Sequence, residues 1–163
     1  MHKLKDFLLR HPIIKNILWA LAVPIGGLMM LNLAFVADAV FQYALDAAVG
    51  VFTPVDNMGW HWFPPLKHTL YLFLLILITW PILKSKLHVL LKAIWLCVPL
   101  AAAALAFGIL LYPHRVATAI VGALSGLGVM YSLWRTKSPW PYWWSFVYIS
   151  ILMFSIALFN VEI

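Results

Sequence analysis

Long apolar runs, separated by short charged connections, constrain this chain more than any other feature. A membrane-spanning helix needs about 20 apolar residues, because the hydrocarbon core is about 30 Å thick and a helix rises about 1.5 Å per residue. The chain is 65% apolar and only 10% charged, too apolar for a water-soluble domain. We therefore predict an all-α, polytopic integral membrane helical bundle that forms a single membrane domain over residues 1–163. After a cytoplasmic arm at 1–16, the predicted spans are 17–37, 66–83, 90–111, 116–133 and 142–159.

Basic residues orient the predicted bundle, since cytoplasmic connections carry an excess of Lys and Arg. With the N-terminus in the cytoplasm, nine of the eleven Lys and Arg residues fall inside, and only Lys67 and Arg115 fall outside. This pattern predicts a protein of the bacterial cytoplasmic (inner) membrane with its C-terminus outside. The basic residues flank spans and form no patch with interleaved aromatics, so the expected partner is the lipid bilayer and not nucleic acid.

Residues 36–53 leave the number of spans open. They are apolar apart from Asp38, Gln42 and Asp46, and they are long enough to cross the bilayer as a sixth span. A sixth span would reverse every later connection, against the distribution of Lys and Arg. We therefore predict five spans plus a polar-striped helix at 38–53, which continues beyond the membrane, lies flat on the outer face or re-enters it. An outer loop follows at 54–65.

The polar stripe is the first candidate binding site. Asp38, Gln42 and Asp46 are spaced by four, so a helix places them on one face over about 12 Å. An ionised Asp costs about 2.5–3.5 kcal/mol at the centre of the membrane, so such acids usually face a wet cavity or a partner. The stripe is then either a cation- or proton-binding site, or the acidic face of an interfacial helix that points to water. The depth of the stripe in the membrane decides between these interpretations, and the sequence does not give that depth.

Further polar groups gather on the predicted outer surface: Asp56, His61, His68, His114 and Arg115. Imidazole and carboxylate groups together can bind a metal or perform acid–base chemistry. Their spacing matches no compact metal motif, so we predict no metal site. Arg115, at a hairpin tip, could instead bind a lipid phosphate through its two parallel N–H groups.

Trp60 and Trp62 flank His61 just before the second predicted span. Tryptophan commonly anchors helices at the membrane interface. The alternative is an aromatic lid over the stripe, which would suit an organic cation through cation–π attraction.

Small residues dominate the third and fourth predicted spans, in an Ala-rich run at 101–104 and in Gly122-x-x-x-Gly126. Such residues let two helix backbones approach closely. We expect them to pack this hairpin together within the chain. The alternative is a homodimer or a membrane protein partner bound through Gly122 and Gly126.

These features predict an outward-facing polar pocket that binds or helps transport a small solute, cation or lipid. One alternative is a membrane-embedded hydrolase or transferase that uses Asp38 or Asp46 with His61, His68 or His114 as acid and base. Another is a non-catalytic subunit of a membrane complex. The sequence identifies no cofactor and no substrate.

Overall fold

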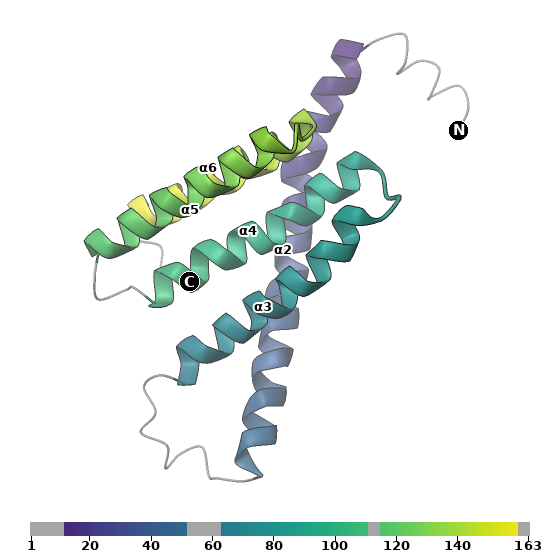
Figure 1. Ribbon diagram of the computed structural model, residues 1–163. Helices are drawn as coiled ribbons and strands as arrows, with labels where there is room; N and C mark the ends of the chain where they lie inside the picture. The colour runs from purple at the N-terminus through teal and green to yellow at the C-terminus, as the bar shows by residue number, and fades with distance from the viewer. Residues whose placement is uncertain (1–11, 52–62, 111–114, 160–163) are drawn as a thin grey trace.

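The computed structural model of this chain describes residues 12–51, 63–110 and 115–159. These residues fold into helices, with no strand among them (Figure 1). The helices are α2 (Pro12–Gly50), α3 (Phe63–Lys84), α4 (Val89–Leu110), α5 (Arg115–Arg135) and α6 (Trp140–Phe159). Within the described ranges, four helices, α2 to α5, are long and apolar enough to cross a membrane. α6 has 20 residues and no charged side chain. The predicted all-α membrane bundle is confirmed.

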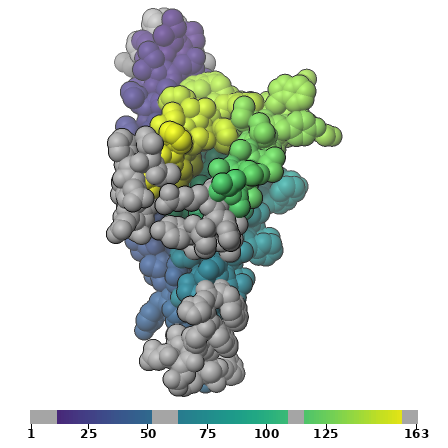
Figure 2. Space-filling model, turned by 90° about the vertical axis from the view of Figure 1, so that its left-hand side faces the viewer, coloured from purple at the N-terminus to yellow at the C-terminus, as the bar shows by residue number. Residues whose placement is uncertain are grey.

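α2 is one uninterrupted helix of 39 residues. It contains both the first predicted span, 17–37, and the predicted polar-striped helix as far as Gly50. A separate sixth span would require the chain to reverse near residue 37, so that alternative is wrong. At about 1.5 Å per residue α2 is about 58 Å long, roughly twice the thickness of the hydrocarbon core. It crosses the other helices obliquely (Figure 1), and its N-terminal turns, in purple, project beyond them (Figure 2).

The shorter helices define two ends of the bundle. The Lys84 end holds the α3–α4 connection, the α5–α6 turn and the first third of α2. There the Trp19 ring meets His88 edge to face, at 5.3 Å between ring centroids, and stacks on Trp140 at 6.2 Å. The Phe63 end holds the last part of α2, the start of α3 and the start of α5. Every candidate site residue that the structure describes lies at or near the Phe63 end.

α4 is the central helix and packs against all four of the others. Its small side chains allow α2 to approach closely: a Cβ atom added to Gly27 would lie 2.8 Å from Sγ of Cys97, and one added to Gly26 would lie 2.8 Å from Cδ1 of Ile94. Cys97 is fully buried there, as expected for an inert thiol. The main buried apolar cluster joins α2, α4 and α6 through Val23, Leu31, Ala93, Cys97, Ala101 and Ile149.

α5 packs more loosely than the sequence predicts. No residue of α5 between 116 and 135 is fully buried. A Cβ atom on Gly122 would meet no atom within 4 Å, and one on Gly126 would meet only Cζ of Phe146, at 3.8 Å. A cavity of about 150 Å³ separates these glycines from α4 and α6. The expected close packing of this hairpin through Gly122 and Gly126 is therefore wrong, and the closest glycine-mediated contact is that of α2 with α4.

Candidate functional site

A row of polar side chains joins α2 to α3 near the Phe63 end. α2 contributes Asp38, Gln42 and Asp46 on one face, as their spacing predicts. α3 contributes Lys67 and His68 on the face that meets α2. The stripe of α2 thus faces a partner helix. This arrangement disfavours the interpretation in which all of its acids simply point to water.

Asp46 and Lys67 form the outermost contact of this row. Nζ of Lys67 donates to both carboxylate oxygens of Asp46, at 2.9 and 3.0 Å. It also lies 5.2 Å from the ring centroid of Phe63. Only 12% of the Lys67 side chain is exposed, against 37% of Asp46. The lysine is therefore neutralised in a mostly apolar setting, and removing its partner would leave a buried charge.

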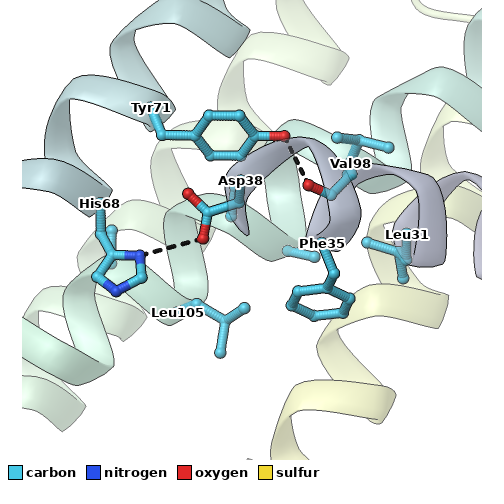
Figure 3. A pocket seen from close by; sticks show the side chains of 11 residues that line it. Leu31, Phe35, Asp38, His68, Tyr71, Val98 and Leu105 are labelled. Carbon is cyan, nitrogen blue, oxygen red and sulfur yellow. Dashed lines mark hydrogen bonds and ion pairs between the residues drawn. The ribbon is translucent and has the colours of Figure 1, made fainter. Parts of the chain in front are cut away.

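Asp38, Gln42 and His68 form the inner cluster, and Figure 3 shows Asp38 and His68 facing each other. Nε2 of Gln42 donates to Oδ2 of Asp38 at 2.7 Å and lies 3.3 Å from Nδ1 of His68. Nδ1 of His68 lies 3.4 Å from the same Asp38 oxygen. The Asp38 side chain is only 16% exposed. Its second oxygen, Oδ1, is buried and has no hydrogen-bond partner among the described residues.

The hydrogen bonds of this cluster are consistent with two protonation states of the Asp38 and His68 pair. With Asp38 ionised and His68 neutral, the amide N–H groups of Gln42 donate to Oδ2 of Asp38 and to Nδ1 of His68. When one proton is added, a half-turn of the amide presents its oxygen instead, which can accept from Nδ1–H of His68 or from a protonated Asp38. Gln42 can therefore keep a hydrogen bond to the cluster with or without an added proton.

A cavity of about 40 Å³ lies beside this cluster, between α2, α3 and α4. A site needs roughly 10–15 Å³ to hold a water molecule, so the cavity has room for a few waters or a small ion. Asp38 and His68 line its polar side, and Leu31, Phe35, Val98 and Leu105 are among its apolar lining (Figure 3). The Tyr71 hydroxyl also borders it but donates to the carbonyl of Ala34 at 2.8 Å. That bond satisfies the Tyr71 hydroxyl, and Oδ1 of Asp38 remains without a hydrogen-bond partner among the described residues.

The cluster lies toward the Phe63 end of helices that are long and apolar enough to cross a membrane. Asp38 is 19 residues beyond Trp19, about 28 Å along α2, and His68 is five residues into α3, about 7.5 Å from its start. The cavity extends along α2 from Asp38 to Leu31, away from that end. Ionisable side chains within such helices usually face a cavity or one another and mark ion or proton pathways.

The structure brings together only part of the predicted site. Asp38, Gln42, Asp46 and His68 converge, whereas the predictions for Asp56, Trp60, His61, Trp62 and His114 lie outside the described residues. Arg115 begins α5, but its side chain also lies outside them. Lys67 and Tyr71 belong to the site and were not predicted. The opposite charges of Asp46 and Lys67 were the available signal, but they are 21 residues apart and their pairing depends on how α3 meets α2.

Metal ligands do not cluster in the part of the chain that the structure describes: it holds no group of three His, Cys, Asp or Glu side chains that could bind a metal ion. Comparison with known proteins adds no assignment. The chain matches no protein-family model, no curated protein and no solved structure. The function must therefore be inferred from the site itself.

Proposed function

We propose that this chain is a bacterial inner-membrane protein that binds a small cation, in the first place a proton, at Asp38, Gln42 and His68, and helps to move it between the cavity and the outer surface. One observation carries the proposal: Asp38 lines a cavity of the bundle, and one of its carboxylate oxygens is buried without a hydrogen-bond partner among the described residues. A buried polar group without a partner is costly, so a bound water, ion or proton would stabilise it.

The size of the cavity favours a proton or a small inorganic cation over an organic solute. About 40 Å³ is far below the 300–1,000 Å³ of typical small-molecule sites. Its apolar walls also offer few groups that could orient a polar solute. A proton needs no more room than the hydrogen bonds of the cluster already provide.

The orientation follows from the positive residues. Lys84, Lys86, Arg135 and Lys137 lie at the Lys84 end, and cytoplasmic connections carry the excess of Lys and Arg. We place the Lys84 end in the cytoplasm, so that the cluster opens toward the outer face. The C-terminus is then outside.

The hydrolase or transferase alternative has one point in its favour, which is the contact between Asp38 and His68. Covalent hydrolysis through a Ser, Thr or Cys nucleophile would also need that side chain beside this pair. No Ser, Thr or Cys side chain lines the cavity in the part of the chain that the structure describes. The pair therefore supports proton binding better than it supports group transfer.

Infrared difference spectroscopy on the protein in lipid nanodiscs tests the proposal directly. Spectra recorded at high and low pH should reveal the C=O stretch of a carboxyl group that takes up a proton, and Asp38→Asn should remove that band. Asp46→Asn is the matched control, because Asp46 is more exposed and is held by Lys67. The band should persist in this control.

The same variants in proteoliposomes test movement. If the movement extends across the whole membrane, an imposed pH gradient should collapse faster with the wild-type protein and with Asp46→Asn than with Asp38→Asn. Retention of the carboxyl band in Asp38→Asn would remove Asp38 from the site. Equal rates of gradient collapse for the wild type and Asp38→Asn would mean that the cluster binds a proton but does not transport it.

A further inference from the structure

A second polar feature lies at the opposite end of the bundle, in the turn between α5 and α6. A hollow of about 500 Å³ is lined there by Leu133, Trp134, Arg135, Lys137, Ser138 and Trp143. Two cationic groups and a hydroxyl thus share one depression with two indole rings. Figure 2 shows this turn, in light green, standing out from the body of the molecule. The position is one where lipid headgroups would meet the protein.

The backbone of this turn fixes where its cations sit. The N–H of Ser138 donates to the carbonyl of Leu133 at 3.0 Å, and the N–H of Lys137 donates to that of Trp134 at 3.1 Å. This pair of bonds is a Schellman motif, which usually has glycine at the position that Lys137 occupies. Lys137 has φ 48°, a left-handed conformation that is unfavourable for a residue with a side chain. The chain thus has a lysine at position 137 although glycine would suit this backbone conformation better.

Among the described residues, no carboxylate neutralises the cations of the Lys84 end. The sequence contains no Asp or Glu between residues 57 and 161. The two acids that the structure describes, Asp38 and Asp46, lie near the Phe63 end and are engaged with His68 and Lys67. Arg135 donates to the Tyr131 hydroxyl at 3.2 Å and forms no ion pair within the part of the chain that the structure describes. The negative charge that balances this hollow must come from outside the described chain.

The carbonyl groups at the C-terminus of α5 attract cations, but this attraction does not account for the hollow. It favours any basic residue in the last turn and falls off beyond it, so Arg135 alone would satisfy it. It gives no reason for a second cation in a strained backbone position, or for two indoles beside it. Arg and Lys are, by contrast, common ligands for phosphate.

We propose that Arg135 and Lys137 bind the phosphate of an anionic phospholipid headgroup, with Trp134 and Trp143 flanking its glycerol and upper acyl region. Tryptophan is enriched at the level of the headgroups, and cationic side chains near an anionic membrane surface each contribute to binding. The site is independent of the proton site at the other end of the bundle. Lipid bound to Arg135 and Lys137 would anchor the C-terminal end of α5 to the membrane. Among the described helices, α5 makes the fewest contacts with its neighbours.

Thermal unfolding of the detergent-purified full chain tests this site with a soluble short-chain phosphatidylglycerol as the probe. The wild-type melting temperature should rise with the probe, and less so at high salt. Arg135→Gln with Lys137→Gln should weaken the apparent affinity on the order of thirtyfold, as expected for the loss of two interfacial cations. Lys84→Gln with Lys86→Gln removes the same charge from the same end and should leave the affinity within about twofold of wild type.

Lys137→Gly separates binding from folding. Glycine suits the left-handed position, so this variant should melt at or above the wild-type temperature while its affinity for the probe falls about fivefold. Short-chain phosphatidylcholine and inorganic phosphate complete the comparison. Equal loss of affinity in both double variants, no response of the wild type, or an equal response to inorganic phosphate or to phosphatidylcholine would each overturn the assignment.

Discussion

Replacing Gly27 by alanine tests the contact on which the bundle is built, that of α2 with α4. The added Cβ would lie 2.8 Å from Sγ and 3.2 Å from Cβ of Cys97, and 3.5 Å from Cε1 of Tyr148. Carbon atoms pack best at about 3.5–4.0 Å. Cys97 is fully buried and cannot move without displacing its neighbours. Either α2 must move away from α4 or the core must rearrange.

The magnitude follows from two opposing effects. Overpacking a well-packed core costs about 1–3 kcal/mol, whereas alanine stabilises a helix by about 0.8–1 kcal/mol relative to glycine. The expected net loss for Gly27→Ala is therefore about 0–2 kcal/mol. Gly122→Ala is a matched control, since it gains the same helix propensity and its Cβ meets nothing within 4 Å. The difference between the two variants isolates the overpacking, at about 1–3 kcal/mol.

Thermal unfolding in one detergent, followed by circular dichroism, measures this difference. For a chain of this size about 1 kcal/mol corresponds to a shift of roughly 2–4 °C, so Gly27→Ala should melt clearly below Gly122→Ala. Combining Gly27→Ala with Cys97→Ala removes Sγ and should recover part of the loss, because the two sites are coupled through direct contact. Equal melting temperatures for the two single variants would refute the close approach of α2 to α4.

Two further predictions concern polar contacts between helices. Asp46→Asn should destabilise the protein by about 1–3 kcal/mol in equilibrium unfolding, and more than Lys67→Met does, because it leaves the largely buried lysine charge without its partner; equal losses would contradict the difference in burial. Ser145→Ala should cost about 0.6 kcal/mol and no more than about 1.7, as other hydrogen bonds between membrane helices do, because the fully buried hydroxyl donates to the carbonyl of Ala93 on α4 at 2.7 Å. No change for Ser145→Ala in the same assay would mean that this contact between α4 and α6 contributes nothing to stability.

The helices could be predicted from sequence because each one is a long apolar run bounded by charge or proline, and the lipid environment leaves the backbone few other choices. The arrangement of the helices could not. Glycines at 26, 27, 122 and 126 look equivalent as small residues, yet only the first pair meets another helix closely. What separates them is the neighbour, since α4 offers α2 a row of small side chains. Which glycines form a close contact therefore depends on the tertiary arrangement of the helices.

The polar stripe shows the same division between local and tertiary information. The spacing of Asp38, Gln42 and Asp46 was sufficient to place them on one face, because that relation is a property of a single helix. Their partners lie across a connection between residues 52 and 62, and no local rule connects Asp38 to His68 or Asp46 to Lys67. The depth of the stripe was equally open, since it depends on α2 continuing unbroken beyond the predicted end of its span.

The charge balance of the seam between α2 and α3 explains why a cation is the expected ligand. Asp46 is neutralised by Lys67, whereas Asp38 contacts the imidazole of His68 and the amide of Gln42. With a neutral imidazole, the inner cluster carries one uncompensated negative charge when Asp38 is ionised. An isolated charge removed from water is strongly disfavoured. A proton, or a small cation in the adjoining cavity, would neutralise it without disturbing the tight apolar contact of α2 with α4. Only the polar contacts between α2 and α3 need change between the cation-free and the cation-bound state. The helix that would move is then α3.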